Sequence, residues 1–272
     1  MTTLSDRTVL ITGAASGIGR ALAYGLAEAK CHLALVDVNA QELAETAANC
    51  AQGQRITTHT VDVSDRDAMA ALPATIQAAH GGVNVLINNA GITVEATFHE
   101  HTLEDWDRVI GVNLWGVIHG CHFFLPQLMA ADEAHIVNIS SIFGVMGVPG
   151  NIAYCASKFG VRGLTETLWE EFEGSHIHVT AVHPGGVNTN IVQSSRHADQ
   201  ATHDKIAAFF ERKTMAPERA AAQIIEAIRA NSPRLVITRD AIMADRLKRM
   251  MPVRGNRIFA KALVKAMGLA EE

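Results

Sequence analysis

A tyrosine and a lysine four residues apart, Tyr154 and Lys158, give this sequence its clearest potential for acid–base chemistry. Residues at positions i and i+4 lie on one face of a helix, so the two side chains would face the same space. An ammonium about 4 Å from a phenol, at an effective dielectric constant of about 20, favours the phenolate by roughly 4 kcal/mol. That corresponds to about three pKa units below the ordinary value near 10. The pair therefore predicts a general acid or base with a pKa close to neutrality.

The glycines between Thr12 and Gly19 form a pattern suited to phosphate binding, G-x-x-x-G-x-G. Glycine lets the backbone turn tightly and approach a pyrophosphate with no Cβ in the way. The segment follows an expected strand, Thr8–Ile11, and opens an expected helix, Gly17–Ala29, whose free N–H groups would attract an anion. A glycine cluster can also be a simple turn, but this position between a first strand and a first helix favours a dinucleotide site.

A carboxylate at the end of the second expected strand, Asp37, lies 18 residues beyond Gly19. At this place a carboxylate meets the adenosine ribose hydroxyls of a dinucleotide and repels a 2′-phosphate. No arginine or lysine stands at Val38 or Asn39 or within the glycine segment. The sequence therefore predicts NAD rather than NADP as the cofactor. The alternative is that Asp37 caps the helix expected at Ala40–Ala51.

Short runs of β-branched residues alternate with longer helical patterns along most of the chain. Such alternation is typical of βαβ units and predicts a parallel sheet covered by helices on both faces. The run Val85-Leu86-Ile87 is apolar throughout, which fits a strand buried on both sides. We expect an α/β fold: a single doubly wound Rossmann domain with a parallel sheet of about seven strands. The expected strands are Thr8–Ile11, His32–Val36, Arg55–Val61, Val83–Ile87, Ala134–Ile139, His176–Val182 and Arg234–Ile237.

The chain divides into an expected domain over residues 1–238 and a C-terminal extension over residues 239–272. A polar, irregular segment lies within the first part, at about residues 190–215. Arg239–Ala270 carries eight basic residues against two acidic ones. Without it and the two terminal glutamates, the body retains 15 basic and 24 acidic residues. The extension is therefore basic and the body acidic.

The composition excludes several classes of protein. The chain has 272 residues, of which 48% are hydrophobic and 19% charged, which rules out a disordered chain. A formal charge of −5 argues against a dedicated nucleic-acid binder. Four cysteines lie far apart and contain no C-x-x-C pair, which indicates reduced thiols in a cytoplasmic protein.

The sequence shows no metal-binding or membrane pattern. Its 13 histidines match no H-E-x-x-H motif, so no metal site is expected. No uninterrupted run of about 18 apolar residues occurs, which argues against a membrane span. The N-terminus has no basic stretch followed by a long apolar one, so no targeting segment is expected.

Four motifs in this order resemble those of the short-chain dehydrogenase/reductase family. They are T-G-x-x-x-G-x-G from Thr12, the turn Asn88-Asn89-Ala90-Gly91, Ser141 thirteen residues before the tyrosine, and Y-x-x-x-K. The resemblance covers the chain from about Thr8 to Ile237. It implies an NAD(P)-dependent oxidoreductase that interconverts a secondary alcohol and a ketone.

The resemblance also implies roles for the residues of these motifs. Tyr154 would transfer a proton to or from the substrate oxygen, which Ser141 would hydrogen-bond. Lys158 would lower the pKa of the tyrosine and bind the nicotinamide ribose. Asn113 would support a water-linked proton relay to the lysine, or else only cap or kink a helix. Spacing alone favours Ser141 over its neighbour Ser140. The expected cofactor-binding residues are Gly13, Ser16, Gly17, Ile18, Gly19, Asp37, Asp62, Val63, Asn89, Ala90, Gly91, Tyr154, Lys158, Pro184, Gly185, Val187 and Thr189.

Apolar residues near the catalytic positions favour a lipophilic substrate. Ser141, Phe143 and Tyr154 are the expected substrate contacts, and residues 190–215 resemble the mobile lid of the family. The further apolar residues considered are Ile142, Val145, Met146, Ile191, Val192, Phe209, Phe210 and Met215. The alternatives are an NADP-dependent carbonyl reductase of 3-oxoacyl thioesters and a dinucleotide sensor without catalysis. Arg196 and Lys205 lie in the expected lid and could pair with a carboxylate, so a negatively charged substrate is a further alternative.

The basic extension contains apolar residues that would share one helical face: Ile258, Phe259, Leu263, Val264 and Met267. Such a helix could lie on an anionic membrane surface. It could also cover the acidic body or the substrate mouth of its own or a neighbouring subunit, which we favour. The resemblance further implies a homodimer or homotetramer built partly from the helices that hold Asn113 and Tyr154.

Overall fold

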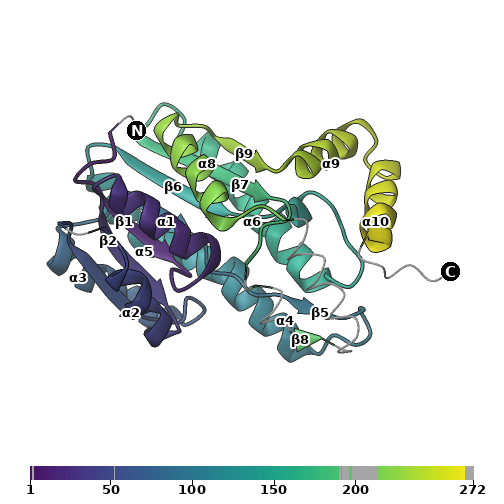
Figure 1. The fold of residues 1–272 in the computed structure, drawn as a ribbon, viewed down its shortest axis with the longest axis horizontal. Coiled ribbons are helices and arrows are strands. Elements are labelled where there is room, and N and C mark those ends of the chain that lie inside the picture. The colour runs from purple at the N-terminus through teal and green to yellow at the C-terminus, as the bar shows by residue number, and fades with distance from the viewer. Residues whose placement is uncertain (2, 52, 190, 192–195, 198–213, 267–272) are drawn as a thin grey trace.

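A seven-stranded parallel sheet forms the centre of the molecule (Figure 1). The computed structural model describes the chain except residues 2, 52, 190, 192–195, 198–213 and 267–272. The strand order is β3-β2-β1-β4-β6-β7-β9, and every neighbouring pair in this sheet is parallel. The strands are β1 (Thr8–Thr12), β2 (His32–Asp37), β3 (Ile56–Thr60), β4 (Val85–Asn88), β6 (Ala134–Ile139), β7 (Ile177–Pro184) and β9 (Arg234–Ile237). The predicted fold class and its seven strands are thereby confirmed.

Helices cover both faces of the sheet, as alternating strands and helices require (Figure 1). One hydrophobic core contains side chains of α1, α2 and α8, and the other contains side chains of α3, α5 and α6. Successive residues of β1 pack into opposite cores. Val9 and Ile11 lie in the first core, and Leu10 lies in the second. The helices are α1 (Gly17–Glu28), α2 (Ala40–Ala48), α3 (Arg66–His80), α4 (Leu103–Ile110), α5 (Gly116–Ala130), α6 (Ile152–Glu171), α8 (Pro217–Arg229), α9 (Arg239–Met250) and α10 (Arg254–Ala266).

The strand order reverses between β1 and β4, and this reversal positions the site. The chain builds β1, β2 and β3 outward in one direction, then returns to place β4 on the other side of β1. Ligands of doubly wound folds bind at such a switch point, outside the carboxyl ends of the strands. The glycine segment follows β1 there, and the Asn88–Gly91 turn begins at the last residue of β4.

A second, two-stranded ladder lies outside the main sheet and was not predicted. Its strands are β5 (Val94–Glu95) and β8 (Arg196–His197). It joins the loop after β4 to the 190–215 segment. Most of that predicted lid, including Val192, Phe209, Phe210 and Lys205, lies outside the described residues.

The stretch Leu103–Ala130 is long and apolar enough, by length and composition, to cross a membrane. It comprises α4, the π-helical segment Gly111–Trp115 and α5. Phe124 and Leu128 of this stretch are fully buried in the core beneath the sheet. These two side chains belong to the protein's own core, whereas Trp115 and Met129 of the same stretch are exposed.

The C-terminal extension forms two helices, α9 and α10, beyond the last strand (Figure 1). Thr238 joins β9 to α9 with φ 83° and caps α9 by accepting a hydrogen bond from the Ala241 N–H. A β-branched residue rarely adopts this left-handed backbone conformation. Thr238 also lies against Gly185, where an added Cβ would be 2.2 Å from the threonine hydroxyl. The extension thus begins in direct contact with the loop after β7.

Candidate active site

A cavity of about 650 Å³ opens at the carboxyl ends of the strands and brings together most of the predicted site residues. Its walls come from the glycine segment, the ends of β2 and β4, the loop after β6, α6 and the loop after β7. The predicted residues that line it are Gly13, Ser16, Gly17, Ile18, Asp37, Asp62, Val63, Asn89, Ala90, Gly91, Ser141, Phe143, Tyr154, Lys158, Pro184, Gly185, Val187 and Thr189. Gly19 and Asn113 do not line it.

The glycine segment is packed so closely that side chains cannot replace its glycines. Gly13 has φ 66°, and a Cβ there would lie 2.8 Å from the Ala90 Cα. A Cβ on Gly19 would lie 2.0 Å from the Gly13 carbonyl oxygen. Asn89 fixes the segment, because its Nδ2 donates to the carbonyl oxygens of Thr12 and Gly13 at 2.9 and 3.1 Å. Gly19 therefore supports the segment from behind rather than facing the cavity.

The residues at this end of the cavity fit a dinucleotide. The N-terminus of α1 opens into the cavity beside Ser16 and Gly17, and the first turn of α1 carries no acidic residue. Its uncompensated N–H groups and partial positive charge suit a pyrophosphate. Gly13 and Gly17 both line the cavity, so backbone of the glycine segment faces it. A Cβ on Gly17 would lie 3.1 Å from the Thr189 side chain, on the same cavity.

Asp37 faces the same cavity from the end of β2. Its two carboxylate oxygens accept hydrogen bonds from the N–H groups of Ala15 and Asn39, both at 3.0 Å. The helix α2 is capped instead by Asn39, whose side chain accepts from the Glu42 N–H. The alternative that Asp37 caps this helix is therefore wrong.

The two asparagines at the end of β4 have different surroundings: one is buried in the interior and the other lines the cavity. Asn88 is buried and donates to Asn138 Oδ1 at 2.8 Å, away from the cavity. Asn89, Ala90 and Gly91 line the cavity. Asp62 accepts hydrogen bonds from the Ser64 N–H and hydroxyl and lines the neighbouring wall with Val63.

Ser141 and Tyr154 are joined by a side-chain hydrogen bond at the opposite end of the cavity. Ser141 is the second residue after the strand β6, which ends at Ile139, and Tyr154 lies in the first turn of α6. Ser140 has a different partner, because its hydroxyl donates to the Lys158 carbonyl oxygen at 2.9 Å. The geometry thus separates the two serines, and only Ser141 reaches the tyrosine hydroxyl.

Lys158 follows Tyr154 by one helical turn and is buried. Its ammonium donates to the Ile139 carbonyl oxygen at 2.9 Å and lies 5.6 Å from the centre of the Tyr154 ring. Burial lowers the pKa of Lys158 to about 8. Burial also raises the pKa of Tyr154 to about 12, against the opposing effect of the Ser141 hydrogen bond. The prediction of a phenol pKa near neutrality is therefore wrong for the protein in this state, because it ignored the loss of hydration.

Asn113 lies at the centre of the π-helical segment between α4 and α5 and is completely buried. Its Nδ2 donates to the Ile92 carbonyl oxygen and the Ser157 hydroxyl at 2.9 and 3.0 Å, and its Oδ1 accepts from the Ile92 N–H. The side chain thereby ties the loop after β4 to α6. Segments of π-helix occur often at functional sites, where they redirect the backbone.

The substrate side of the cavity is apolar around Ser141. Ile142 and Phe143 line it, and the Phe143 ring meets the Tyr154 ring edge-on at 6.0 Å between centroids. Val145 and Met146, which we expected near the substrate, are buried in a small core behind this wall. Ile191 also lines the cavity, whereas Met215 packs against the first main core.

Sequence reasoning missed several polar residues of the cavity, among them Thr93, Glu95 and Asn151. Thr93 donates to Asn151 Oδ1 at 3.4 Å. Burial raises the pKa of Glu95 to about 7. The signal that could have found Glu95 is its place four residues after Gly91, in a loop at the carboxyl edge of the sheet.

Three residues of the C-terminal extension, Asp240, Phe259 and Leu263, also line the cavity. Ile258, which we placed on the same helical face, has 52% of its surface exposed. The predicted apolar face of this helix is therefore displaced by about one residue, and Met267 lies outside the described residues. Over the described part of the chain, no group of three or more histidine, cysteine, aspartate or glutamate side chains could hold a metal ion.

Comparison with known proteins identifies the family. The family model described as short chain dehydrogenase matches residues 7–200. The chain is 38% identical over 270 residues to SadH of Mycobacterium tuberculosis, described as an oxidoreductase, covering 97% of this chain and 98% of that protein. It is 36% identical over 192 residues to the 3-oxoacyl-[acyl-carrier-protein] reductase FabG of Thermotoga maritima, covering 70% of this chain and 78% of the reductase.

A solved structure with the same fold contains the predicted cofactor. It is a short-chain dehydrogenase/reductase from Burkholderia phymatum in complex with NAD, with a TM-score of 0.86 and 30% identity over 92% of this chain and 95% of that one. Levodione reductase is also similar, with a TM-score of 0.78 and 29% identity over 86% of this chain and 96% of that one. The cavity, its serine–tyrosine–lysine group and these matches agree, and the chain belongs to the short-chain dehydrogenase/reductase family of oxidoreductases.

Proposed function

We propose that this protein is an NAD-dependent oxidoreductase that interconverts a lipophilic secondary alcohol and the corresponding ketone. One observation carries the proposal. A single cavity holds the hydrogen-bonded pair Ser141 and Tyr154 with Lys158 at one end, and the glycine segment with Asp37 at the other. A dinucleotide lying between the two ends would place a substrate carbon next to the tyrosine.

The positions of the cavity residues suggest a role for each in cofactor binding or proton transfer. Bound NAD supplies the acceptor for hydride. The N-terminus of α1 binds the pyrophosphate, and Asp37 binds the adenosine ribose hydroxyls. In the oxidation, the Tyr154 phenolate takes the proton from the substrate alcohol and becomes the hydroxyl. In the reverse direction, the Tyr154 hydroxyl gives its proton to the ketone oxygen. The Ser141 hydroxyl holds the same oxygen and fixes its distance from the tyrosine.

Lys158 and Asn113 support the proton transfer. Lys158 carries its charge beside the Tyr154 ring and stabilises the phenolate. We also assign to it the nicotinamide ribose hydroxyls. Asn113 connects Ile92 to Ser157 and so fixes α6 against the loop after β4. We include it as a support of the relay that carries the proton from Tyr154 through Lys158 to water.

The preference for NAD follows from the charges around the adenosine end. Asp37 would repel the 2′-phosphate of NADP. The nearest arginine after the glycine segment, Arg20, is engaged with Glu42 at 2.8 Å and with the Thr46 hydroxyl at 3.1 Å. The Burkholderia phymatum structure, which contains NAD, supports this assignment.

A 3-oxoacyl thioester is the second candidate substrate, and the relative from Thermotoga maritima favours it. The two candidates differ in cofactor and in substrate size. Oxidation of a series of 2-alkanols with NAD, against reduction of an acetoacetyl thioester with NADPH, would distinguish them by kcat/KM.

The test of catalysis is the variant Tyr154→Phe. It should lose at least 100-fold in kcat while its affinity for NADH, measured by fluorescence, changes less than twofold. The control is Tyr24→Phe, which alters the only other tyrosine of the chain and should leave both values unchanged. Full turnover by Tyr154→Phe would refute the role given to Tyr154. An inactive wild type that still binds NADH would favour a dinucleotide sensor.

We further propose that the protein is a cytoplasmic homodimer or homotetramer that binds no nucleic acid. Large apolar side chains are exposed on the helices around the catalytic residues, including Trp115 at 52% and Phe159 at 39%. These side chains would be covered by the same helices of a second copy. Light scattering after gel filtration should give a multiple of 29.2 kDa, and Trp115→Glu should shift the mass toward one copy.

A further inference from the structure

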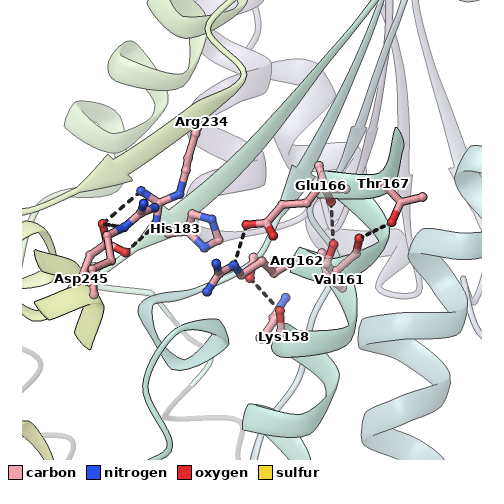
Figure 2. Close-up of polar contacts among 12 residues, drawn as sticks. Lys158, Val161, Arg162, Glu166, Thr167, His183, Arg234 and Asp245 are labelled. Carbon is pink, nitrogen blue, oxygen red and sulfur yellow. Dashed lines mark hydrogen bonds and ion pairs between the residues drawn. The ribbon is translucent and has the colours of Figure 1, made fainter. Parts of the chain in front are cut away.

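The two helices of the C-terminal extension are attached to the catalytic domain at buried polar contacts. In the first, Arg234 of β9 binds both carboxylate oxygens of Asp245 in α9, at 2.6 and 3.1 Å. Figure 2 shows this pair beside His183, at the end of β7. Asp245 is 7% exposed, and Arg249 of α9 adds a further contact at 3.2 Å. A buried ion pair of this geometry fixes one orientation of α9 on the sheet.

The second attachment joins α10 to the loop that carries Ser141. The Asn256 side chain pairs with both main-chain groups of Gly147: Oδ1 accepts from the Gly147 N–H and Nδ2 donates to its carbonyl oxygen, both at 2.9 Å. Lys248 of α9 also donates to Asn256 Oδ1, at 3.1 Å. A side-chain amide that satisfies both groups of one residue specifies position as well as distance.

A tight turn brings the two helices together. A Cβ on Gly255 would lie 2.7 Å from the Leu247 carbonyl oxygen, so only glycine allows α10 to approach α9 this closely. The following turns place Asn256, Phe259 and Leu263 on one face, at spacings of three and four residues. This face is partly buried, whereas Arg257, Ile258 and Lys261 on the other face are exposed.

Phe259 and Leu263 extend the apolar wall that begins at Ser141. Phe259 packs against the small core of Ile142, Val145 and Met146, immediately behind Phe143. Phe259 and Leu263 line the same cavity as Ser141 and Tyr154. The inward face of α10 therefore meets the space beyond the reacting oxygen, and the basic residues of the helix lie on the face that points away from it.

We propose that α10 forms the outer wall of the substrate site, where Phe259 and Leu263 select substrates that carry an extended apolar group on the reacting carbon. This proposal rests on the proposed alcohol and ketone chemistry and defines its substrate class. Asn256 is a positioning residue that holds the wall in place. An alkyl chain of several carbons would lie against the two side chains, whereas a short substrate would end before them.

The test compares chain-length dependence in wild type and variants. The kcat/KM for NAD-dependent oxidation should rise from 2-butanol to 2-decanol in the wild type. Phe259→Ala and Leu263→Ala should each lose about tenfold of kcat/KM for 2-decanol and less than twofold for 2-butanol. The matched control is Ile258→Ala, an exposed apolar residue of the same helix, which should change neither value. Equal losses for both alcohols, or an unchanged chain-length dependence, would overturn the proposal.

A binding measurement separates this proposal from the proposed reaction. Titration of 2-butanone and 2-decanone into the Tyr154→Phe protein with NADH requires no turnover. Loss of the preference for 2-decanone on adding Phe259→Ala supports the wall even if the wild type oxidises no alcohol. Retention of that preference, or no binding of either ketone at millimolar concentration, counts against it.

Asn256→Ala tests the positioning role. It should raise KM for 2-decanol several-fold with little change in kcat, and it should speed hydrogen exchange over residues 254–266. Arg257→Ala, at the exposed neighbouring position, is the control. A fall in kcat for 2-butanol, with no change in KM for 2-decanol, would contradict the assignment.

Discussion

The Lys158 ammonium donates its hydrogen bond to the Ile139 carbonyl oxygen at 2.9 Å, while it lies 5.6 Å from the centre of the Tyr154 ring. The lysine is thus held by the end of β6, on the strand that leads to Ser141. Its ammonium lies over the Tyr154 ring, a position that helical spacing alone does not specify. Burial of the phenol raises the pKa of Tyr154 to about 12, and the opposing effect comes from the Ser141 hydrogen bond.

The raised pKa of Tyr154 can be measured directly, because the chain contains only two tyrosines, Tyr24 and Tyr154. In Tyr24→Phe, the ultraviolet absorbance of tyrosinate should stay low up to about pH 11, since burial disfavours the charged phenolate. Saturating NAD should shift the onset to lower pH, because the nicotinamide ring is positively charged. Ionisation near pH 7 without NAD would contradict the structure, and Tyr154→Phe provides the signal of Tyr24 alone.

Asp37 should decide the choice between the two dinucleotides. Asp37→Ser removes the negative charge that would face a 2′-phosphate, so the ratio of kcat/KM for NADP to that for NAD should rise at least tenfold. Asn39→Ala is the matched control two residues away. It removes the cap of α2 and should cost about 1 kcal/mol of stability without changing the cofactor ratio. An unchanged ratio in Asp37→Ser would refute the role given to the carboxylate.

The central strands of the sheet were predictable because they are buried on both faces and therefore largely apolar, as in β4. The edge strand β3 is partly exposed and was predicted from its β-branched residues. The predicted strand Thr8–Ile11 and the observed Thr8–Thr12 differ by one residue, and Val83–Ile87 and Val85–Asn88 by no more than two at either end. The β5–β8 ladder was not predictable, because two residues per strand show no periodicity. The two strands β5 and β8 also lie far apart in the sequence.

The site was predictable as a set of residues but not in its geometry. The spacing of Tyr154 and Lys158 fixes a shared helical face, yet it gives neither the direction of the ammonium nor the hydration that the phenol loses. The predicted apolar face of α10 included Ile258, whereas the observed inward face includes Asn256 instead. Apolar periodicity gives no weight to a polar residue such as Asn256. That polar side chain faces inward since the Gly147 main chain supplies its partners.

The ion pair of Arg234 and Asp245 should contribute measurably to stability because little of either side chain is exposed, 20% and 10%. Asp245→Asn leaves Arg234 without its counter-charge and should lower the free energy of unfolding by about 3 kcal/mol. The control is Glu226→Gln, which breaks an exposed pair with Arg229 and should cost less than about 0.5 kcal/mol. Similar losses in both variants, measured by urea unfolding, would show that burial of the Asp245 pair adds nothing.

Buried histidines should make the fold sensitive to mild acid. Burial, with a smaller contribution from His178, lowers the pKa of His135 to about 3. Burial, followed by the charge of Arg55, lowers the pKa of His80 to about 4. An unfolded chain restores both to about 6.5.

Below pH 6.5 the unfolded state therefore takes up protons that the folded state does not bind, so stability falls as pH falls. Each group contributes a slope of up to about 1.4 kcal/mol per pH unit, until pH approaches its folded-state pKa. The free energy of urea unfolding, measured between pH 8 and 4.5, should be level above pH 7 and decline below pH 6.5. His135→Gln and His80→Gln should each reduce the slope of that decline by the equivalent of about one proton, whatever they do to stability at pH 8. His80 is only partly buried, so His80→Gln serves as the test if His135→Gln does not fold. An undiminished slope in the variants would show that these histidines are not the source of the pH dependence.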